Sequence, residues 1–480
     1  MKKYLFFFFA SLASGSGFAQ GYQVTLKARQ FNSGIAYLTY WMGSNLNIAD
    51  SAAVNNTGTA IFKGPEKLPG GIYVIVFPGK QSRIEFLIDK QQLITIVTDT
   101  SDLVNKTVIT GSFENILYEQ YQKFVSAKGK QLQFERKAYM ASITKADSAL
   151  HEKNYNVYNK QLNDYRETVI KNQPSSMLAA LLLAMKDPKI PAAIPITHKD
   201  SVDNYNYYKD HYWDGINFMD DRIIRTPFFI KKLERYYREV IPKDPDSIIK
   251  DADYKLLLAR SSPEMFKYLL NWLTDEYLNP KYMGQDAVFV HLFEKYHSKG
   301  ISKWLNQKQM EAISRRAYMV MSNLIGEKGA NLEMVDSTGK PSSLYSVTAD
   351  YTVMCFWDPN CGHCKIELPR LDSIYQASWK NHGVKIYAVL TPDDKSFKKS
   401  EWVNYTIANK LTDWIHVYQT PEMEVADNKA QLPNFRQLYD ITITPTLYLL
   451  DKEKRIIGKK LTWEQLNELL EVKWKNKPSN

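Results

Sequence analysis

The sequence has few cysteines, no long apolar run after its start and no block of basic residues. Its three cysteines all lie between residues 355 and 364. Because no cysteine stands directly after the N-terminal segment, the usual acylated anchor of a lipoprotein is excluded. After that segment, no apolar run approaches the roughly twenty residues that a membrane-spanning helix needs. The formal net charge is +10, but basic and acidic residues are interspersed, which indicates a solvated surface and no nucleic-acid interface.

The first nineteen residues have the composition of a secretory signal peptide. Lys2 and Lys3 form a charged start, Tyr4–Leu12 forms an apolar core, and Gly17-Phe18-Ala19 is a small-x-small cleavage site before Gln20. The alternative is an uncleaved anchor, although the segment is short for a membrane span. Export would place the remaining chain in the periplasm or cell envelope, where disulfides persist.

The stretch that carries the cysteines also carries the strongest motif. An apolar run, Tyr351–Trp357, predicts a buried strand, and Asp358-Pro359-Asn360 predicts a turn. Cys361 then opens a helical pattern, so its thiol lies at a helix N-terminus, where N–H groups and the dipole stabilise a thiolate. Cys364, one turn along, can reach back to close a disulfide. The spacing predicts a dithiol–disulfide site, with protonated His363 as a second stabiliser of the anion.

This stretch resembles the thioredoxin superfamily, and within it the TlpA/ResA-like envelope proteins. The resemblance covers roughly Gly326 to Val472 and rests on Phe356-Trp357, Cys361-x-x-Cys364, Glu367, Pro369 and Thr444-Pro445-Thr446. It implies a thioredoxin fold in which a cis Pro445 presses the backbone of Thr444 beside the sulfurs. It also implies thiol–disulfide exchange that needs neither a cofactor nor a metal.

Each residue of the motif has an expected role. Cys361 is the predicted nucleophile and Cys364 the predicted resolving thiol, which needs a proton acceptor. Typical thioredoxins place a buried aspartate two residues before the tryptophan, where this chain has Cys355; we expect Cys355 to fill core space, with a resolving role as the alternative. The resemblance assigns the acceptor role to Glu367, which is otherwise an exposed helix carboxylate. The inner residue His363 raises the reduction potential, which leaves reductase, oxidase and isomerase open.

At 480 residues the chain is too long for one domain, and we expect three or four. The predicted organisation is a signal peptide (1–19), a β-sandwich-like domain (20–111), a helical region (112–200), a helical domain (201–325) and a thioredoxin-like domain (326–480). The predicted fold class is therefore multidomain, α+β and α/β.

Residues 22–109 show seven short apolar or alternating runs with turn residues between them, which predicts a small sandwich or barrel. The runs are Tyr22–Leu26, Ile35–Tyr40, Ala60–Phe62, Ile72–Phe77, Ile84–Ile88, Leu93–Val97 and Thr107–Ile109. The stretch resembles a β domain of unassigned function that precedes thioredoxin domains in envelope proteins of gram-negative bacteria. The matching residues are Asp50-Ser51, Phe62-Lys63-Gly64, Pro69 and Tyr73. We expect a structural or docking module here.

The middle of the chain has helical periodicity. Ile116–Gln173 predicts a two-helix hairpin, and Met177–Met185 predicts a short core helix. Further helices are predicted at Pro227–Val240, Asp246–Ala259, Pro263–Tyr277, Gln285–His297 and Lys308–Ile325. The region from residue 201 resembles a helical domain of unassigned function paired with thioredoxin domains, on His211-Tyr212-Trp213-Asp214, Thr226-Pro227, Pro245-Asp246-Ser247 and Met283-Gly284.

Three residues of the helical domain have partial metal-site spacing. His291 and Glu294 are three apart and share a helix face, but His297 is six from His291 and does not. Metal-binding pairs on helices favour a spacing of four. We therefore expect no metal here.

The last domain is longer than a minimal thioredoxin. Residues 391–433 predict an insertion with a helix at Phe397–Lys410 and a strand at Trp414–Tyr418. Thr462 with Gln465 three residues on is a capping box for the final helix.

The leading hypothesis is an exported thiol–disulfide oxidoreductase that reduces or exchanges disulfides of envelope proteins, with a membrane thiol-transfer protein as electron partner. A peroxide-reducing enzyme is disfavoured, because Met354 and Asp358 stand where a Pro-x-x-x-Thr-x-x-Cys pattern needs proline and threonine. The other alternative is a binding or scaffold protein, since more than half of the chain lies outside the redox domain. The oligomeric state stays open.

Overall fold

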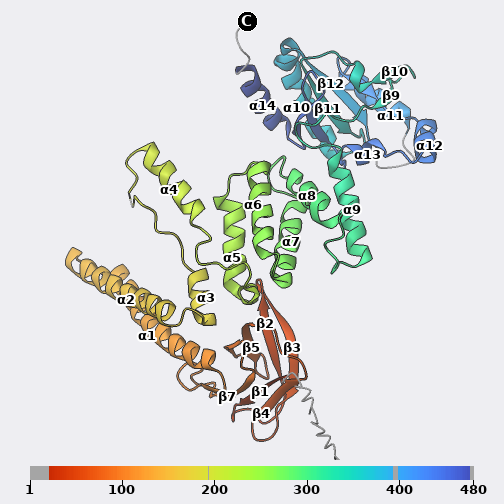
Figure 1. Cartoon of the computed structure of the whole chain (residues 1–480). Coiled ribbons are helices and arrows are strands. Elements are labelled where there is room, and N and C mark those ends of the chain that lie inside the picture. Colours follow the sequence, from red (N-terminus) through yellow and green to blue (C-terminus); the bar gives the residue numbers. More distant parts are fainter. Residues whose placement is uncertain (1–20, 193, 393–397, 476–480) are drawn as a thin grey trace, which may run out of the picture. The chain divides into compact units, whose positions relative to one another are not determined.

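The computed structural model describes residues 21–192, 194–392 and 398–475. The predicted signal peptide lies outside the described residues. The chain divides into two compact units, one made of Met1–Ile241 with Leu257–Tyr268 and the other of Pro242–Leu256 with Leu269–Asn480. Figure 1 follows the elements along the chain. Among the described residues, no helix combines the length and the apolar character needed to cross a membrane.

The first unit begins with two four-stranded sheets, in the strand orders β4-β1-β7-β8 and β3-β2-β5-β6. The strands are β1 (Tyr22–Lys27), β2 (Ile35–Met42), β3 (Asn45–Ala53), β4 (Thr59–Gly64), β5 (Gly71–Val76), β6 (Arg83–Ile88), β7 (Leu93–Val97) and β8 (Val108–Thr110). Side chains of both sheets, among them Val24, Leu26, Leu38 and Ile75, share one buried core. The predicted sandwich is confirmed; β3 is an additional strand that the sequence pattern did not predict.

The helices that follow in this unit are α1 (Phe113–Ala141), α2 (Lys145–Asn172), α3 (Met177–Ala184), α4 (His198–Asp210), η1 (Asp221–Arg225), α5 (Pro227–Arg235) and η2 (Tyr236–Val240). α1 and α2 form the predicted hairpin (Figure 1), in which Tyr165 stacks on Phe124 with ring centroids 4.2 Å apart. Asn115 fixes α1 to the sandwich, because its amide bonds both the N–H and the C=O of Leu87 at 2.7 Å. α3 is almost wholly buried, as expected of a core helix.

The helices α6 (Pro245–Ala259) and α7 (Pro263–Leu278) contribute residues to both units, and α8 (Asp286–Leu292), η3 (Phe293–His297) and α9 (Gln307–Met321) belong to the second. With α5 and η2, which cover the predicted Pro227–Val240, all five helices predicted from residue 227 onward are present. α9 ends at Met321, four residues before the predicted end, where Asn323 N–H bonds the Val320 carbonyl in a tight turn.

The rest of the second unit is built on a five-stranded sheet in the order β13-β12-β11-β14-β15. Its elements are β9 (Glu333–Val335), β10 (Pro341–Ser343), η4 (Leu344–Ser346), β11 (Tyr351–Trp357), α10 (Gly362–Ala377), η5 (Trp379–His382), β12 (Val384–Leu390), α11 (Lys399–Ala408), β13 (Ile415–Val417), α12 (Pro421–Lys429), α13 (Phe435–Leu438), β14 (Thr446–Leu450), β15 (Ile456–Lys459) and α14 (Trp463–Lys475). β11 is parallel to β12 and antiparallel to β14. The central strand of the sheet therefore carries the cysteine motif at its C-terminal end.

Alternate residues of β11 enter two different cores. Val353, Cys355 and Trp357 pack in one core with side chains of α10, α11 and α14. Met354 and Phe356 pack on the opposite face with the β9–η4 segment and the residues around α13. Burial on both faces explains why β11 is a continuous apolar run instead of an alternating one. The capping box predicted for α14 is confirmed, since Thr462 N–H bonds Gln465 and Gln465 N–H bonds Thr462 Oγ1.

Candidate active site

The cysteine motif forms a strand, a tight turn and a helix. After β11, Asp358 accepts the N–H of Asn360 through its carboxylate at 2.8 Å and the N–H of Cys361 through its carbonyl at 3.1 Å. α10 begins at Gly362 with Cys361 as its N-cap residue, and the Cys361 side chain makes no capping hydrogen bond. First-turn N–H groups therefore remain available to a sulfur at this position.

Cys361 is the accessible thiol of the pair. All three cysteines are free thiols, so the structure is the dithiol form, and the Cys361 Sγ lies 3.2 Å from the Thr444 carbonyl oxygen. Burial acts to raise the pKa of Cys361, but hydrogen bonds from the Thr444 side chain and the Cys364 and His363 backbone outweigh it. The pKa therefore lies below its ordinary value, as nucleophilic attack near neutral pH requires.

Cys364 has the opposite character. Its side chain is fully buried one turn into α10. Burial, reinforced by the hydrogen bond and the charge of Cys361, raises the pKa of Cys364 to about 12. A thiol of this kind reacts only when a base removes its proton or when the Cys361 sulfur is already bonded.

Cys355 lies in the same core as Cys364 and is also fully buried. Burial, followed by the charge of Cys364, raises the pKa of Cys355 well above its ordinary value. Cys355 thus fills core space, as predicted, and is a neutral thiol at the position where typical thioredoxins have an acid.

The opposite wall of the site is the segment before β14. The Thr444–Pro445 peptide bond is cis, which confirms the prediction for this proline. Phe356 of β11 pairs with Thr446 of β14, so the start of β14 lies beside the end of β11. This register places Thr444 and Pro445 next to the cysteines although 83 positions separate Thr444 from Cys361.

A pocket of about 670 Å³ opens in front of Cys361. Its walls come from α10, the cis-proline segment and the start of α14: Cys361, His363, Glu367, Leu368, Leu371, Thr442, Ile443, Thr444, Pro445, Thr446, Leu447, Lys460, Leu461, Thr462 and Trp463. Five of the six residues predicted for the site line it, and the sixth, Cys364, lies behind Cys361 in the core. Lys460 to Trp463 were not predicted to line the site, because nothing in their sequence indicates a role in it. The fold brings them close to the cysteines.

His363 and Glu367 both line this pocket but differ in solvent exposure. His363 is exposed, one residue from Cys364. Glu367 is partly buried and is paired with Arg370, whose Nη1 lies 3.2 Å from Glu367 Oε1. Glu367 therefore holds a proton-accepting group on the α10 wall of the pocket, and its transfer of a proton from Cys364 stays a prediction.

The helical histidines have structural partners instead of a common ligand. His291 Nε2 lies 3.0 Å from both carboxylate oxygens of Asp253. His297 is buried between the hydroxyls of Thr274 and Ser302, at 2.9 and 2.6 Å. Across the described ranges, no group of three or more His, Cys, Asp or Glu side chains could hold a metal ion.

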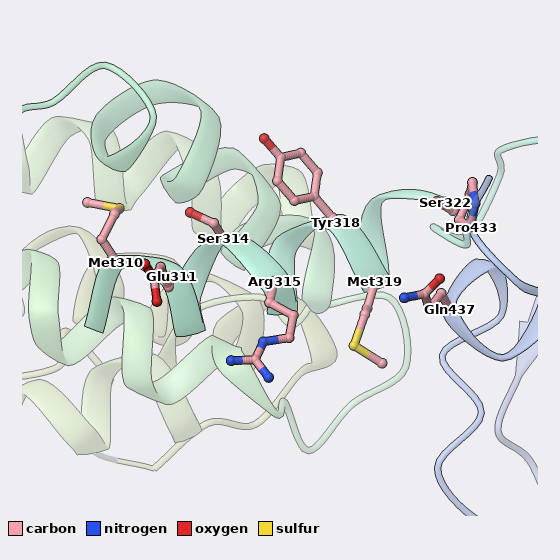
Figure 2. Close-up of a pocket in the computed structure, with 9 residues that line it drawn as sticks. All are labelled: Met310, Glu311, Ser314, Arg315, Tyr318, Met319, Ser322, Pro433 and Gln437. Carbon is pink, nitrogen blue, oxygen red and sulfur yellow. The ribbon is translucent and has the colours of Figure 1, made fainter. Parts of the chain in front are cut away.

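A second pocket, of about 600 Å³, lies along α9 at some distance in sequence from the cysteines. It is lined by Met310, Glu311, Ser314, Arg315, Tyr318, Met319 and Ser322, and by Pro433 and Gln437 near α13. Figure 2 shows Met310, Ser314 and Tyr318 on one side of α9 and Arg315 and Met319 on the other. The lining contains no cysteine and no histidine that could activate its serines, so we assign the chemistry to the cysteine pocket.

Comparison with protein families gives three matches that do not overlap. Residues 325–459 match the AhpC/TSA family. Residues 22–118 match a domain of unknown function, DUF4369, and residues 151–323 match another, DUF5106.

Comparison with individual proteins finds thiol–disulfide proteins. The thiol-disulfide oxidoreductases ResA of Bacillus thuringiensis and Bacillus anthracis are each 26% identical over 148 residues, which is 31% of this chain and 75% of theirs. A domain of a possible thiol-disulfide isomerase from Cytophaga hutchinsonii is 34% identical, with 32% of this chain and 97% of that chain covered and a TM-score of 0.27. A thioredoxin-like protein from Bacteroides caccae is 22% identical, with 60% and 98% covered and a TM-score of 0.45.

The dithiol at the end of the central strand, the cis-proline opposite it and these matches define an enzyme class: thiol–disulfide oxidoreductases with a thioredoxin-like fold. Residues 325–459, which match the AhpC/TSA family, form the thioredoxin-like domain. The chain is a multidomain protein whose redox domain is similar to TlpA/ResA-like oxidoreductases, and the segments that match DUF4369 and DUF5106 precede this domain.

Proposed function

We propose that this protein is exported and uses the Cys361–Cys364 dithiol to reduce or exchange disulfides of envelope proteins. The observation that carries the proposal is the contrast between the two thiols. Cys361 is accessible with a lowered pKa, and Cys364 is buried with a raised pKa. One thiol is therefore suited to attack and the other to resolve.

The reaction takes two exchange steps. The Cys361 thiolate attacks one sulfur of the client disulfide; a Cys361–client bond forms, the client S–S bond breaks, and the leaving thiolate takes up a proton. Cys364 then loses its proton and attacks Cys361 Sγ, which forms the Cys361–Cys364 disulfide and releases the second client thiol. The client gains two electrons and the enzyme loses two.

Two neighbouring side chains are proposed to control these steps. Glu367, on the α10 wall of the pocket, is the proton acceptor for Cys364. His363 stabilises the Cys361 thiolate when protonated, and so favours the dithiol and raises the potential of the couple. The Thr444 backbone and Pro445 form the wall of the pocket that faces α10, and a client would contact this wall as it reaches Cys361.

Export rests on the sequence of the first nineteen residues. In an oxidising compartment the dithiol needs a source of electrons, and a membrane thiol-transfer protein would supply them by the same exchange in reverse. The periplasm or cell envelope is the proposed location, without an acylated anchor.

A turnover assay tests the proposal. The reduced chain should reduce insulin disulfides catalytically in the presence of a thiol donor. Cys361→Ser should abolish turnover, whereas Cys364→Ser should accumulate a mixed disulfide between Cys361 and the substrate. Absence of turnover in the wild type would favour the scaffold alternative, because a scaffold needs no turnover.

The AhpC/TSA match keeps a second candidate in view, a peroxide-reducing activity. Met354, in the position where the peroxide-reducing pattern has proline, is fully buried on β11, and buried Asp358 replaces the threonine. We therefore expect hydrogen peroxide consumption by the reduced protein to be no faster than that of an ordinary thiol. Rapid consumption that depends on Cys361 would make this candidate the better one.

A further inference from the structure

A third pocket of the same compact unit adjoins the active-site pocket. Its volume is about 460 Å³, and it is lined by the loop from Asn279 to Gly284, by Asp286 and Arg316 of the helical domain, and by Asp440, Lys459, Lys460, Leu461 and Gln465 of the redox domain. Lys460 and Leu461 line the active-site pocket as well. A polypeptide with its cysteine at Cys361 can therefore continue over these two residues into the third pocket.

Buried ion pairs hold the walls of this pocket in place. Asp440, with 1% of its side chain exposed, binds Arg316 Nη1 at 2.7 Å through one oxygen and Lys460 Nζ through the other. Lys459 Nζ, also buried, bonds Asp286 and the carbonyl of Asn323, the latter at 2.8 Å. Sites whose side chains are fixed before binding lose less entropy when a ligand arrives.

The charges around the pocket do not cancel. Four cationic side chains, Lys281, Arg316, Lys459 and Lys460, line it together with two carboxylates, Asp286 and Asp440. Both carboxylates are already bonded to cations from this set, which leaves an excess of two positive charges. Lys281 is exposed at the rim. The pocket therefore favours an anionic group.

The loop also offers apolar surface. Tyr282 and Met283 are 44% and 45% exposed. Met283 is nonetheless positioned, because its Sδ accepts the N–H of Lys459 at 3.4 Å. An exposed but fixed apolar pair beside a cationic pocket suits a peptide segment that carries both an aliphatic or aromatic residue and an acidic one.

We propose that this pocket is a second subsite for the polypeptide whose disulfide Cys361 attacks, and that it selects clients with an acidic residue flanking the reactive cysteine. The inference rests on the proposed function and assigns the helical domain a part in client recognition. The loop Asn279–Gly284 provides the selectivity and the dithiol provides the chemistry.

The test uses the full-length reduced protein and two peptides of equal length, each with one cysteine blocked as a mixed disulfide with 2-nitro-5-thiobenzoate. One peptide has Asp and Glu beside the cysteine, and the other has two lysines. Release of the chromophore measures the rate of attack. We expect the acidic peptide to react about five- to tenfold faster at low salt, and the ratio to fall toward one as salt screens the charges.

Lys281→Glu should abolish or invert this preference, and the mixed disulfide of the neutral thiol 2-mercaptoethanol, measured in parallel, reports on the dithiol alone. Lys299→Glu is the matched control, because Lys299 is an exposed lysine of the helical domain outside the residues that line either pocket, and it should keep the preference. Equal rates for the two peptides, or a preference that survives Lys281→Glu, would overturn the subsite. Failure of the wild type to react with any of the three disulfides would instead refute the proposed function.

Discussion

The difference between the two active-site thiols predicts strongly selective alkylation. With a pKa of about 12, Cys364 is a thiolate in about one molecule in 100,000 at pH 7, whereas Cys361, below its ordinary 9.0, is ionised in more than about one in 100. This is a difference of more than about a thousandfold. A thiolate of higher pKa is intrinsically more reactive, with a Brønsted slope of about 0.4–0.5, which recovers about 20- to 30-fold. Cys361 should therefore react at least about thirtyfold faster than Cys364, before burial slows Cys364 further.

The assay is a time course of iodoacetamide labelling of the reduced native protein at pH 7. Because trypsin does not cleave the Lys340–Pro341 bond, one tryptic peptide, residues 329–365, contains all three cysteines, and the labelled positions must be assigned by fragmentation. Denatured protein should label the three thiols at similar rates and provides the control. Labelling of Cys364 or Cys355 within tenfold of Cys361 in the native protein would refute the reasoning.

The remaining predictions concern four other side chains. Glu367→Gln should slow release of the mixed disulfide and spare its formation; an unchanged release rate over pH 6–9 would exclude Glu367 as the proton acceptor. His363→Pro should lower the reduction potential by tens of millivolts in equilibrium with glutathione, where about 30 mV is tenfold in the equilibrium constant, and a rise would contradict the proposed role. Asp440→Asn removes the carboxylate that binds two cations and should cost about 1–3 kcal/mol of stability in urea unfolding; a cost near zero would mean that this pair does not hold the pocket walls. Burial lowers the pKa of His297 to about 4, so only the unfolded chain takes up this proton between pH 6.5 and 4; stability should fall by up to about 3 kcal/mol over that range, and a pH dependence that is unchanged in His297→Gln would count against it.

The pattern of apolar residues predicted most of the helices and strands, and the elements that it did not predict have a feature in common. β3 is an edge strand in which no side chain is buried, and the alternation that begins at Asn45-Leu46-Asn47-Ile48 does not continue through the rest of the strand. α4 and α12 are likewise polar helices that bury little, and α12 buries no side chain completely. Their only sequence signals are caps, Thr197 with Asp200 for α4 and Thr420 before Pro421 for α12. Elements that bury little leave little periodicity to read.

The residues of the site likewise fall into those that the sequence predicted and those that it did not. Cys361, Cys364 and the cis Pro445 were predicted because local motifs specify them, and the structure places Cys361 at the helix terminus as expected. Lys460 and Leu461 were not predicted, because ordinary residues after a strand carry no mark of the pocket they line. The same holds for the bond between Arg316 and Asp440, which joins residues 124 positions apart. Local chemistry can be read from sequence, whereas long-range juxtaposition needs the fold.

The antiparallel pairing of β11 with β14 determines where this domain can accept insertions. Phe356 and Thr446 are held opposite each other by the sheet, so the connecting chain has no part in setting the distance from Cys361 to Thr444. That chain includes the helices α11 and α12. Lengthening such a connection costs only about 0.6 kcal/mol for each doubling. The segment between β12 and β14 is therefore a place where new recognition elements can be inserted, exchanged or lost between relatives while the spacing of the reactive groups stays constant.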